Sequence, residues 1–238
     1  MSGPGAVVFL DFDGTITLRD ATDAILDAFA DPEWLQVEDA WLSGQIGSRE
    51  CLAAQMALVN ATRDQVDRLL DDIGVDPGFA MLLGTCAARA APVHIVSDGF
   101  DYCIGRILGR EDLHLRERLT SSHIVSSSLG PEGGRWRATF AHPPCAHGCA
   151  TCKPAAMERL SPTGAVTVFV GDGMSDRYAA ACANVVFAKD KLAAFCDNAS
   201  IPYTPYDTLA AVAEGIERLL EASAPRPRSF SRKVFPVV

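Results

Sequence analysis

The stretch Val7-Val8-Phe9-Leu10-Asp11-Phe12-Asp13-Gly14-Thr15 starts as an apolar run and ends in two carboxylates, a glycine and a hydroxyl residue. The β-branched apolar run is typical of a strand buried on both faces of a parallel sheet. Because side chains two positions apart in a strand point to one face, Asp11 and Asp13 are expected to lie together. Their mutual repulsion must be relieved by a shared proton or a bound cation. At the carboxyl end of a strand in an open α/β sheet, where ligands bind, a cation is the favoured explanation.

Downstream of residue 90 the hydrophobic pattern alternates between strands and helices. Strands are predicted over 93–97, 119–127, 135–140, 165–170 and 185–187, and helices over 101–109, 154–160, 175–183, 191–198 and 208–222. This alternation is typical of a parallel sheet with right-handed crossovers. We therefore predict an α/β fold with a doubly wound parallel sheet.

Between the first strand and this alternating region the sequence predicts only helices. The first helix is predicted over 21–29. Asp31-Pro32 signals the start of a helix that runs to Trp41, and Ser48 the start of one that runs to Val59. Thr62 and Gln65 form a capping box at the start of another helix, and Asp76-Pro77 signals the start of a helix that runs to Ala90. Residues 18–75 are therefore expected to form a helical insert. The proline- and arginine-rich tail, residues 223–238, is expected to be flexible.

Composition and charge exclude several classes of protein. The 238 residues are 48% hydrophobic and 21% charged, as in an ordinary globular protein, and the formal net charge of −9 argues against a nucleic-acid partner. No signal peptide is expected because the N-terminus lacks a basic segment, and no apolar stretch is long enough to cross a membrane. Eight cysteines without a secretory signal indicate reduced thiols. We expect a cytoplasmic protein with no membrane partner.

Polar groups stand at four places that the predicted sheet brings to one edge. They are Asp-Phe-Asp-Gly-Thr at 11–15, Ile-Val-Ser at 95–97, Lys153 just before a helix, and Gly-Asp-Gly-Met-Ser-Asp at 171–176. In residue type, order and spacing they resemble the motifs of the haloacid dehalogenase superfamily of aspartyl-phosphate hydrolases, and the resemblance extends to about residue 222. It implies a Rossmann-like core made of residues 1–17 and 76–222, with residues 18–75 as a small helical cap over the active site.

The resemblance also implies a role for the two N-terminal acids. Asp11 would be the nucleophile that forms an aspartyl-phosphate. Asp13 would protonate the leaving oxygen and then deprotonate the attacking water. From the residues alone, the spacing shows only that both acids share a face, and Asp13 could instead cap the turn that follows it.

The same resemblance implies a magnesium site. Mg²⁺ prefers octahedral oxygen ligands and keeps several waters. Asp11, the backbone carbonyl of Asp13 and Asp172 would supply the protein ligands, and Asp176 would hold a water ligand. A first-turn acid that offsets a helix dipole is the structural alternative for Asp176.

Two further residues are implied to contact the phosphoryl group. Ser97 would donate a hydrogen bond to a phosphoryl oxygen, and Lys153 would place its ammonium group against the phosphoryl group and the Asp11 carboxylate. The structural alternatives are a strand-end turn residue for Ser97 and an exposed surface lysine for Lys153.

Two groups within the superfamily are similar to the chain. Phosphoserine phosphatases carry an acid near the place of Asp20 and a cap arginine that binds the substrate carboxylate, where this sequence has Ala54 or Gln55, with Arg49 nearby. The methionine-salvage phosphatases acting on 2-hydroxy-3-keto-5-methylthiopentenyl-1-phosphate are similar in three segments: Pro32-Glu33-Trp34, Cys145 to Cys152 before Lys153-Pro154, and Phe187 to Asp190. The sequence Ser97-Asp98-Gly99 departs from the Ser-Gly-Gly that is usual in both groups.

Candidates for contact with the substrate are Asp20, Gly99 and Trp41. Trp41 shares a helix face with Trp34 and Glu38, and this placement equally fits the core of the cap.

A cluster of zinc-ligand types precedes Lys153. His142, Cys145, Cys149 and Cys152 have a spacing compatible with tetrahedral Zn²⁺. The alternative is a set of reduced, partly buried thiols.

We therefore expect a Mg²⁺-dependent phosphatase for a small phosphorylated metabolite, with 2-hydroxy-3-keto-5-methylthiopentenyl-1-phosphate as the first choice. Phosphoserine or another small phosphate is the alternative substrate. A catalytically silent binding protein on the same fold is the alternative from a different class, and the sequence leaves a homodimer open.

Overall fold

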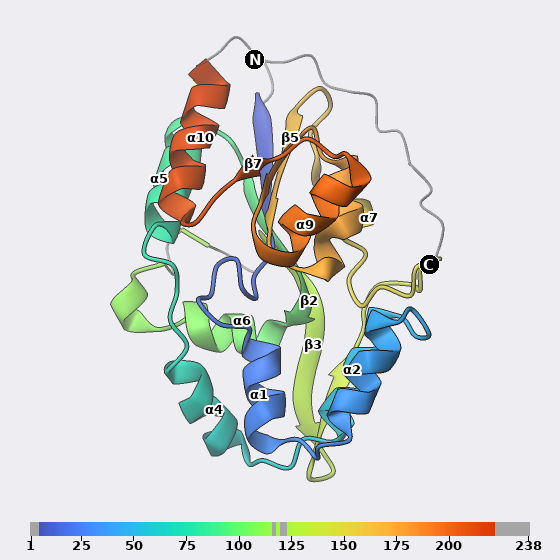
Figure 1. The fold of residues 1–238 in the computed structure, drawn as a ribbon. Coiled ribbons are helices and arrows are strands. Elements are labelled where there is room, and N and C mark those ends of the chain that lie inside the picture. The colour runs from blue at the N-terminus through green and yellow to red at the C-terminus, as the bar shows by residue number, and fades with distance from the viewer. Residues whose placement is uncertain (1–4, 116–117, 120–122, 222–238) are drawn as a thin grey trace.

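The computed structural model describes residues 5–115, 118–119 and 123–221, and its centre is a seven-stranded sheet (Figure 1). The strand order is β4-β3-β2-β1-β5-β6-β7, and every neighbouring pair is parallel except β3 with β4. β1 (Ala6–Leu10) lies between β2 (Val93–Phe100) and β5 (Val166–Gly171). The predicted α/β fold with a doubly wound parallel sheet is confirmed.

The remaining strands are β3 (Ile124–Glu132), β4 (Arg135–Thr139), β6 (Val185–Ala188) and β7 (Thr204–Pro205). The helices that follow the insert are α5 (Phe79–Ala88), α6 (Asp101–Leu108), α7 (Lys153–Leu160), α8 (Arg177–Cys182), α9 (Asp190–Ala199) and α10 (Leu209–Glu221). Two short 3₁₀ turns complete these elements, Glu111–Leu113 and Met174–Asp176.

Helices cover both faces of β1, and this explains why its sequence is apolar throughout. All five residues are fully buried. Val8 and Leu10 face one core cluster, which also holds residues of α5, α6 and α10, and Val7 and Phe9 face a second cluster with residues of α7, α8 and α9. Each such large apolar side chain contributes about 1.5–3 kcal/mol when it is buried. The position of β1 in the centre of the sheet is thus set by burial on two sides.

Four helices connect β1 to α5. They are α1 (Ala21–Phe29), α2 (Trp34–Leu42), α3 (Ser48–Ala57) and α4 (Arg63–Asp71). An antiparallel bridge between Thr17 and Val75 closes the base of this segment, and in Figure 1 α1, α2 and α4 lie beyond the carboxyl end of β1. The chain therefore returns to the sheet close to where it left. The division into a core and a cap at residues 18–75 stays a prediction.

The capping signals of the insert have mixed outcomes. The capping box of Thr62 and Gln65 is confirmed. Asp31 is not a helix cap, because α2 starts three residues later and the Asp31 carboxylate accepts a hydrogen bond from the Glu33 amide instead. The N-cap of α3 is Gly47 without a side-chain hydrogen bond, since Ser48 directs its hydroxyl elsewhere. At Asp31 a local turn replaces the predicted cap, whereas at Ser48 a distant partner, the Asp98 carboxylate, does so.

Two strand predictions also change. β2 runs through Ser97 to Phe100 with a shift in its pairing to β3, so the predicted strand-end residues remain in an extended strand. β3 starts at Ile124 and continues to Glu132, later than the predicted range, whose residues 120–122 lie outside the described residues. Gly133 and Gly134 then make the tight turn to β4, both with positive φ, which glycine adopts without strain.

None of the helices in the described ranges has the length and the apolar character that crossing a membrane requires. The predicted flexible tail, residues 223–238, lies outside the described residues.

Candidate active site

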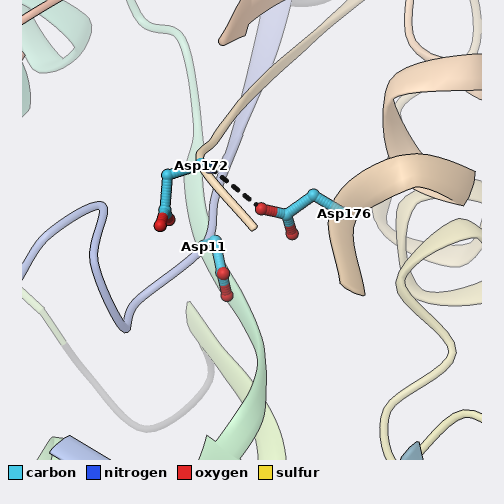
Figure 2. A group of neighbouring side chains, drawn as sticks. All are labelled: Asp11, Asp172 and Asp176. Carbon is cyan, nitrogen blue, oxygen red and sulfur yellow. Dashed lines mark hydrogen bonds between the residues drawn. The ribbon is translucent and has the colours of Figure 1, made fainter. Parts of the chain in front are cut away.

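The carboxyl ends of β1 and β5 bring three acids together. Leu10 pairs with Val170 across these parallel strands, and the Asp11 amide continues the ladder by donating to the Val170 carbonyl at 2.9 Å. Asp11 and Asp172 therefore leave neighbouring strands side by side, and Asp176 approaches from the 3₁₀ turn before α8 (Figure 2). One carboxylate oxygen from each of the three lies within 4.8 Å of the others.

Lys153 is buried against this cluster at the first position of α7. Its Nζ lies 2.8 Å from Asp11 Oδ1 and 2.5 Å from Asp176 Oδ1. Burial disfavours the ammonium form, but the charges of Asp11, Asp176 and Asp98 outweigh burial and raise the pKa of Lys153 above its ordinary value. The surface-lysine alternative is therefore wrong, and a permanent positive charge faces the nucleophile candidate.

Asp176 connects Lys153 to the backbone that follows β5. Its Oδ1 receives Lys153, and its Oδ2 accepts the backbone amides of Asp172 and Gly173, each at 3.1 Å. The first of these amide bonds is the dashed line in Figure 2. A side chain at Gly171 would meet Asp176 Oδ2 at 2.3 Å, so only glycine leaves room for this carboxylate. One Asp176 oxygen lies close enough to those of Asp11 and Asp172 to share a cation with them. Both Asp176 oxygens, however, already accept hydrogen bonds from the protein.

The Asp13 carboxyl group is positioned by the start of the insert. Its Oδ1 accepts the Ala21 amide at the first turn of α1, at 2.9 Å. Burial above all, with smaller contributions from the charges of Asp11 and Asp172, raises the pKa of Asp13 to about 7 against the hydrogen bond from Ala21. Asp13 therefore bonds the start of α1, eight residues away, instead of the turn that directly follows it. It also retains a carboxyl group that can gain and lose a proton near neutral pH.

Three residues support Asp172. The Thr15 hydroxyl donates to Asp172 Oδ1 at 2.7 Å, and the Tyr206 hydroxyl donates to the Gly171 carbonyl at 3.3 Å. Gly14 has a φ of +73°, and a Cβ there would lie 2.3 Å from Asp172 Oδ2. The sequence analysis did not single out Tyr206, because nothing in its local pattern distinguishes it from an ordinary core tyrosine.

The segment Ser97-Asp98-Gly99 faces the same cluster from β2. The buried Ser97 hydroxyl accepts the Gly99 amide at 3.0 Å. Asp98 Oδ2 accepts the Ser48 hydroxyl at 2.6 Å, and Asp98 Oδ1 accepts the Thr151 amide at 3.0 Å. The sequence analysis assigned Asp98 no role, although its departure from the usual glycine was the available signal. It joins α3 of the insert to the segment that precedes Lys153.

A cavity of about 440 Å³ opens onto these groups. It is lined by Asp11, Asp13, Ser97, Gly99 and Asp172 from the strand ends and by Asp20, Trp41, Leu52 and Gln55 from the insert. The candidate substrate residues Asp20, Gly99 and Trp41 are thus brought to the same cavity. Asp20 also caps α1, because its carboxylate accepts the Asp23 amide at 2.9 Å.

The oxygen donors of the cluster fit a hard divalent cation. Burial first, and repulsion from Asp11 second, together raise the pKa of Asp172 to about 6, and a bound cation would relieve both effects. Within the described residues, the acids Asp11, Asp172 and Asp176 are the group whose ligand atoms converge as a metal requires. The Asp13 carboxylate lies outside that group, and its predicted contribution through the backbone carbonyl stays a prediction.

The zinc interpretation of the cysteine cluster is not supported. In the part of the chain that the structure describes, His142, Cys145, Cys149 and Cys152 do not form a converging set of ligand atoms. The backbone carbonyl of His142 accepts a hydrogen bond from Arg49 instead.

Comparison with known proteins assigns the chain to a family. The sequence profile described as haloacid dehalogenase-like hydrolase matches residues 8–181. The chain belongs to that family. The predicted resemblance is therefore confirmed.

Named relatives cover almost the whole chain. The 2-hydroxy-3-keto-5-methylthiopentenyl-1-phosphate phosphatase of Geobacillus thermodenitrificans (strain NG80-2) is 31% identical over 220 residues, which cover 90% of this chain and 96% of the relative. The phosphatase of the same name from Bacillus velezensis (strain DSM 23117 / BGSC 10A6 / LMG 26770 / FZB42) is 27% identical over 223 residues, 92% of each chain. This haloacid dehalogenase-like hydrolase is therefore an enzyme, a phosphatase, and the silent binding protein is set aside.

Solved structures of phosphoserine phosphatase have the same fold. A substrate-bound phosphoserine phosphatase complex superposes with a TM-score of 0.67 at 18% identity, covering 90% of this chain and 99% of the other. A phospho-aspartyl intermediate analogue of phosphoserine phosphatase gives a TM-score of 0.65 at 18% identity, with coverage of 88% and 98%. At these identities the likeness concerns the fold alone.

The arginine at the start of α3 points away from the cavity of this hydrolase. Arg49 donates from its guanidinium to the His142 carbonyl at 2.5 Å, and its backbone amide donates to the Gly148 carbonyl at 3.0 Å. Gln55 does line the cavity, and its Nε2 donates to Glu38 at 2.9 Å. The described part of α3 therefore places no guanidinium against the cavity.

Replacing Gly99 with alanine is expected to displace Asp13. The new Cβ would lie 2.3 Å from Asp13 Oδ2 and 3.1 Å from Ser97 Oγ. We expect kcat to fall on the order of a hundredfold, the scale of about a 1 Å misplacement of a reacting group. Gly105→Ala in α6 is the matched control, because nothing lies within 4 Å of its Cβ, and it should leave kcat unchanged. Equal kcat for Gly99→Ala and the control would contradict the positioning of Asp13 by this glycine.

Proposed function

We propose that this phosphatase hydrolyses a small phosphomonoester in a Mg²⁺-dependent reaction with Asp11 as the nucleophile. The observation that carries the proposal is the Asp11 carboxylate, which is buried at the end of β1, ion-paired with Lys153 and clustered with Asp172. A phosphomonoester dianion repels a carboxylate, so attack requires positive charge beside both groups. Lys153 supplies one such charge from within the protein.

Two steps follow from this arrangement. First, an Asp11 oxygen bonds to phosphorus, the bond from phosphorus to the leaving oxygen breaks, and Asp13 gives that oxygen a proton. Second, a water attacks phosphorus, its proton passes to Asp13, and the bond to Asp11 breaks to release inorganic phosphate. The raised pKa of Asp13, about 7, supports both proton transfers. Ser97 lines the cavity, and in this proposal its hydroxyl donates a hydrogen bond to a phosphoryl oxygen.

The metal would be held by Asp11, Asp172 and the backbone carbonyl of Asp13, with Asp176 in reach through a water. When bound there, Mg²⁺ supplies further neutralisation of the charge shared by the phosphoryl oxygens and the nucleophile. Asp176 itself acts mainly by holding Lys153 and the backbone of residues 172 and 173.

The first-choice substrate is 2-hydroxy-3-keto-5-methylthiopentenyl-1-phosphate. Relatives that span 90% or more of the chain carry this activity in their names. Trp41 and Leu52 give the cavity apolar surface at the side of the insert, which suits a small metabolite with an apolar tail. We propose that residues 18–75 act as the cap that encloses this substrate, and that the enzyme works in the cytoplasm.

Phosphoserine is the second candidate because the solved structures of similar fold are phosphoserine phosphatases. Such a substrate brings a carboxylate that needs a cation. Because Arg49 is directed toward the His142 carbonyl, α3 places no cation at the cavity. Arg19, Lys189 and Lys191 also line the cavity, so the choice between the two substrates rests on the named relatives and not on the missing α3 guanidinium.

A panel of phosphorylated metabolites tests the proposal. With Mg²⁺ present, we expect kcat/KM for the methylthio substrate to exceed that for phosphoserine by about tenfold or more, the scale set by one mismatched polar group. Exhaustive chelation should remove phosphate release, and added Mg²⁺ should restore it. A preference for phosphoserine would reverse the choice of substrate, and full activity after chelation would exclude the metal requirement.

A further inference from the structure

Asp98 is an acid at the active-site cavity that the proposed chemistry does not use. It lies on β2 where the pairing with β3 is irregular, because the pairing passes from 96 to 100 on β2 but only from 125 to 127 on β3. In a regular strand consecutive side chains point to opposite faces. Here both Ser97 and Asp98 line the cavity. The irregularity therefore brings an additional carboxylate to this edge of the sheet, as bulges next to active sites do.

The Asp98 carboxylate accepts hydrogen bonds from two separate parts of the chain. Its Oδ1 accepts the Thr151 amide at 3.0 Å, and its Oδ2 accepts the Ser48 hydroxyl of α3 at 2.6 Å. The Ser48 hydroxyl in turn accepts the Ala150 amide at 2.9 Å. Asp98 and Ser48 together therefore bind two consecutive backbone amides in the segment that leads to Lys153.

The first turn of α7, which carries Lys153, has little local support of its own. Its N-cap residue, Cys152, makes no side-chain capping hydrogen bond with the described residues, and Pro154 lacks an amide hydrogen. Residues 150, 151 and 153 are nonetheless buried, with at most 1% of each exposed. The place of Lys153 is therefore set by how the segment before it is held.

The start of α3 is fastened to the same segment by its backbone. A Cβ at Gly47 would lie 2.5 Å from the Gly148 carbonyl oxygen, so the two chains approach as closely as glycine allows. The Arg49 amide donates to that carbonyl at 3.0 Å, and its guanidinium donates to a second backbone carbonyl of the segment at 2.5 Å. Ser48, between Gly47 and Arg49, is therefore presented from the insert at a fixed place.

We propose that Asp98 is a positioning residue for the phosphatase reaction. Through the Thr151 amide it holds Lys153 at 2.8 Å from Asp11. Through the Ser48 hydroxyl it makes that placement depend on the docking of α3. One carboxylate thus links the insert to the cation that faces the nucleophile. This inference rests on the proposed function, because it requires that Asp11 and Lys153 carry the reaction.

Hydrolysis of an aryl phosphate by the full chain with Mg²⁺ tests the role of Asp98. Asp98→Ala removes both hydrogen bonds, and we expect kcat to fall by about ten- to a hundredfold, the scale of about a 1 Å misplacement of a reacting group. KM should change little, because the misplaced group acts mainly in the transition state. Asp98→Asn keeps an acceptor for the Thr151 amide and a polar partner for Ser48, so it should restore most of the lost turnover.

Thermal unfolding in the same preparations shows whether each variant is folded. A folded Asp98→Ala variant with unchanged kcat overturns the proposal. So does an Asp98→Asn variant as inactive as Asp98→Ala, because the charge of Asp98, and not its hydrogen bonds, would then be what matters.

A double variant shows whether the effect of Asp98 passes through Lys153. In a Lys153→Met background, Asp98→Ala should lower kcat no further, because two changes that act through one group are not additive. A second fall as large as in the unmodified enzyme overturns the proposal. Asp11→Asn in the same assay separates the two possible failures. Its activity would contradict the proposed function, whereas an inactive Asp11→Asn beside a fully active Asp98→Ala contradicts the positioning role alone.

Ser48→Ala tests the link to the insert. It removes the hydroxyl that Asp98 and the Ala150 amide bind, and we expect kcat to fall by about three- to tenfold, the scale of one hydrogen bond. Ser43→Ala is the matched control, because the exposed Ser43 hydroxyl donates to the Ala40 carbonyl at the end of α2, and it should leave kcat unchanged. Equal kcat for the two serine variants overturns the dependence on α3.

Discussion

Asp11→Asn is expected to abolish phosphate release while leaving the fold intact. The amide has the shape of the carboxylate but cannot form the acyl phosphate, so kcat should fall on the order of 10⁴-fold or more, as when a nucleophile is removed. The effect on stability should be smaller, since the loss of the ion pair with Lys153 is offset by relief of repulsion. Asp11 raises the pKa of both Asp172 and Asp176 through its charge, and Lys153 keeps its contact with Asp176.

Aryl phosphate hydrolysis and thermal unfolding measure these two effects in the same preparation. Asp27→Asn is the matched control, because Asp27 is an exposed acid paired only with the exposed Arg19 within the described contacts. It should change neither kcat nor the unfolding temperature. Activity of the Asp11 variant above a few per cent of the unmodified enzyme would remove Asp11 as the nucleophile.

Lys153→Met should have the second largest effect, on both activity and stability. The methionine side chain is similar in length, but it leaves the carboxylates of Asp11 and Asp176 without a cation in a buried site. We expect kcat to fall on the order of 10²–10³-fold, the scale of losing one charged group that stabilises the transition state. Breaking a buried ion pair by removing one partner costs about 3–5 kcal/mol, and we expect a loss of stability toward the lower end because Asp176 can take up a proton.

The stability that Lys153→Met loses relative to the unmodified enzyme should increase as pH rises. Burial, followed by the charge of Asp11, already raises the pKa of Asp176, and removing Lys153 raises it further. An acid with a raised pKa in the folded state stabilises the fold while it is protonated, and this contribution is lost as pH rises. The raised pKa of Lys153 acts in the unmodified enzyme, where its contribution is fully present below its unfolded pKa. The free-energy difference between variant and unmodified enzyme should therefore grow from pH 5 to pH 8.

Denaturant unfolding at the two pH values checks this expectation. Arg218→Ala is the control, since Arg218 is exposed and its ion pair with Glu214 on the same helix contributes little, about 0.2–1 kcal/mol. A Lys153 variant whose stability deficit shrinks with rising pH would contradict the ion-pair account.

Predictions from the sequence succeeded where the deciding physics is local. The alternation of buried strands and helices and the capping box at Thr62 depend on neighbours a few residues apart. The shared edge for Asp11 and Asp172 follows because parallel strands end at one side of a sheet. Local rules failed at Ser48, whose hydroxyl bonds Asp98, a residue 50 positions away in the chain. No helix-capping preference contains that information.

The amino-acid sequence by itself determined the α/β sheet, the helical insert and the residue types of the active site, because backbone periodicity, burial and chemical character are properties of short segments. Only the tertiary structure decided that Lys153 is buried between Asp11 and Asp176, and that Tyr206 and Thr15 support the Asp172 segment. It also decided that Asp98 joins α3 to the segment before Lys153. These contacts join residues far apart in the chain. Their partners are chosen by the packing of β1, β2, β5 and the insert around one buried group of charges, where each carboxylate must find a donor or a cation.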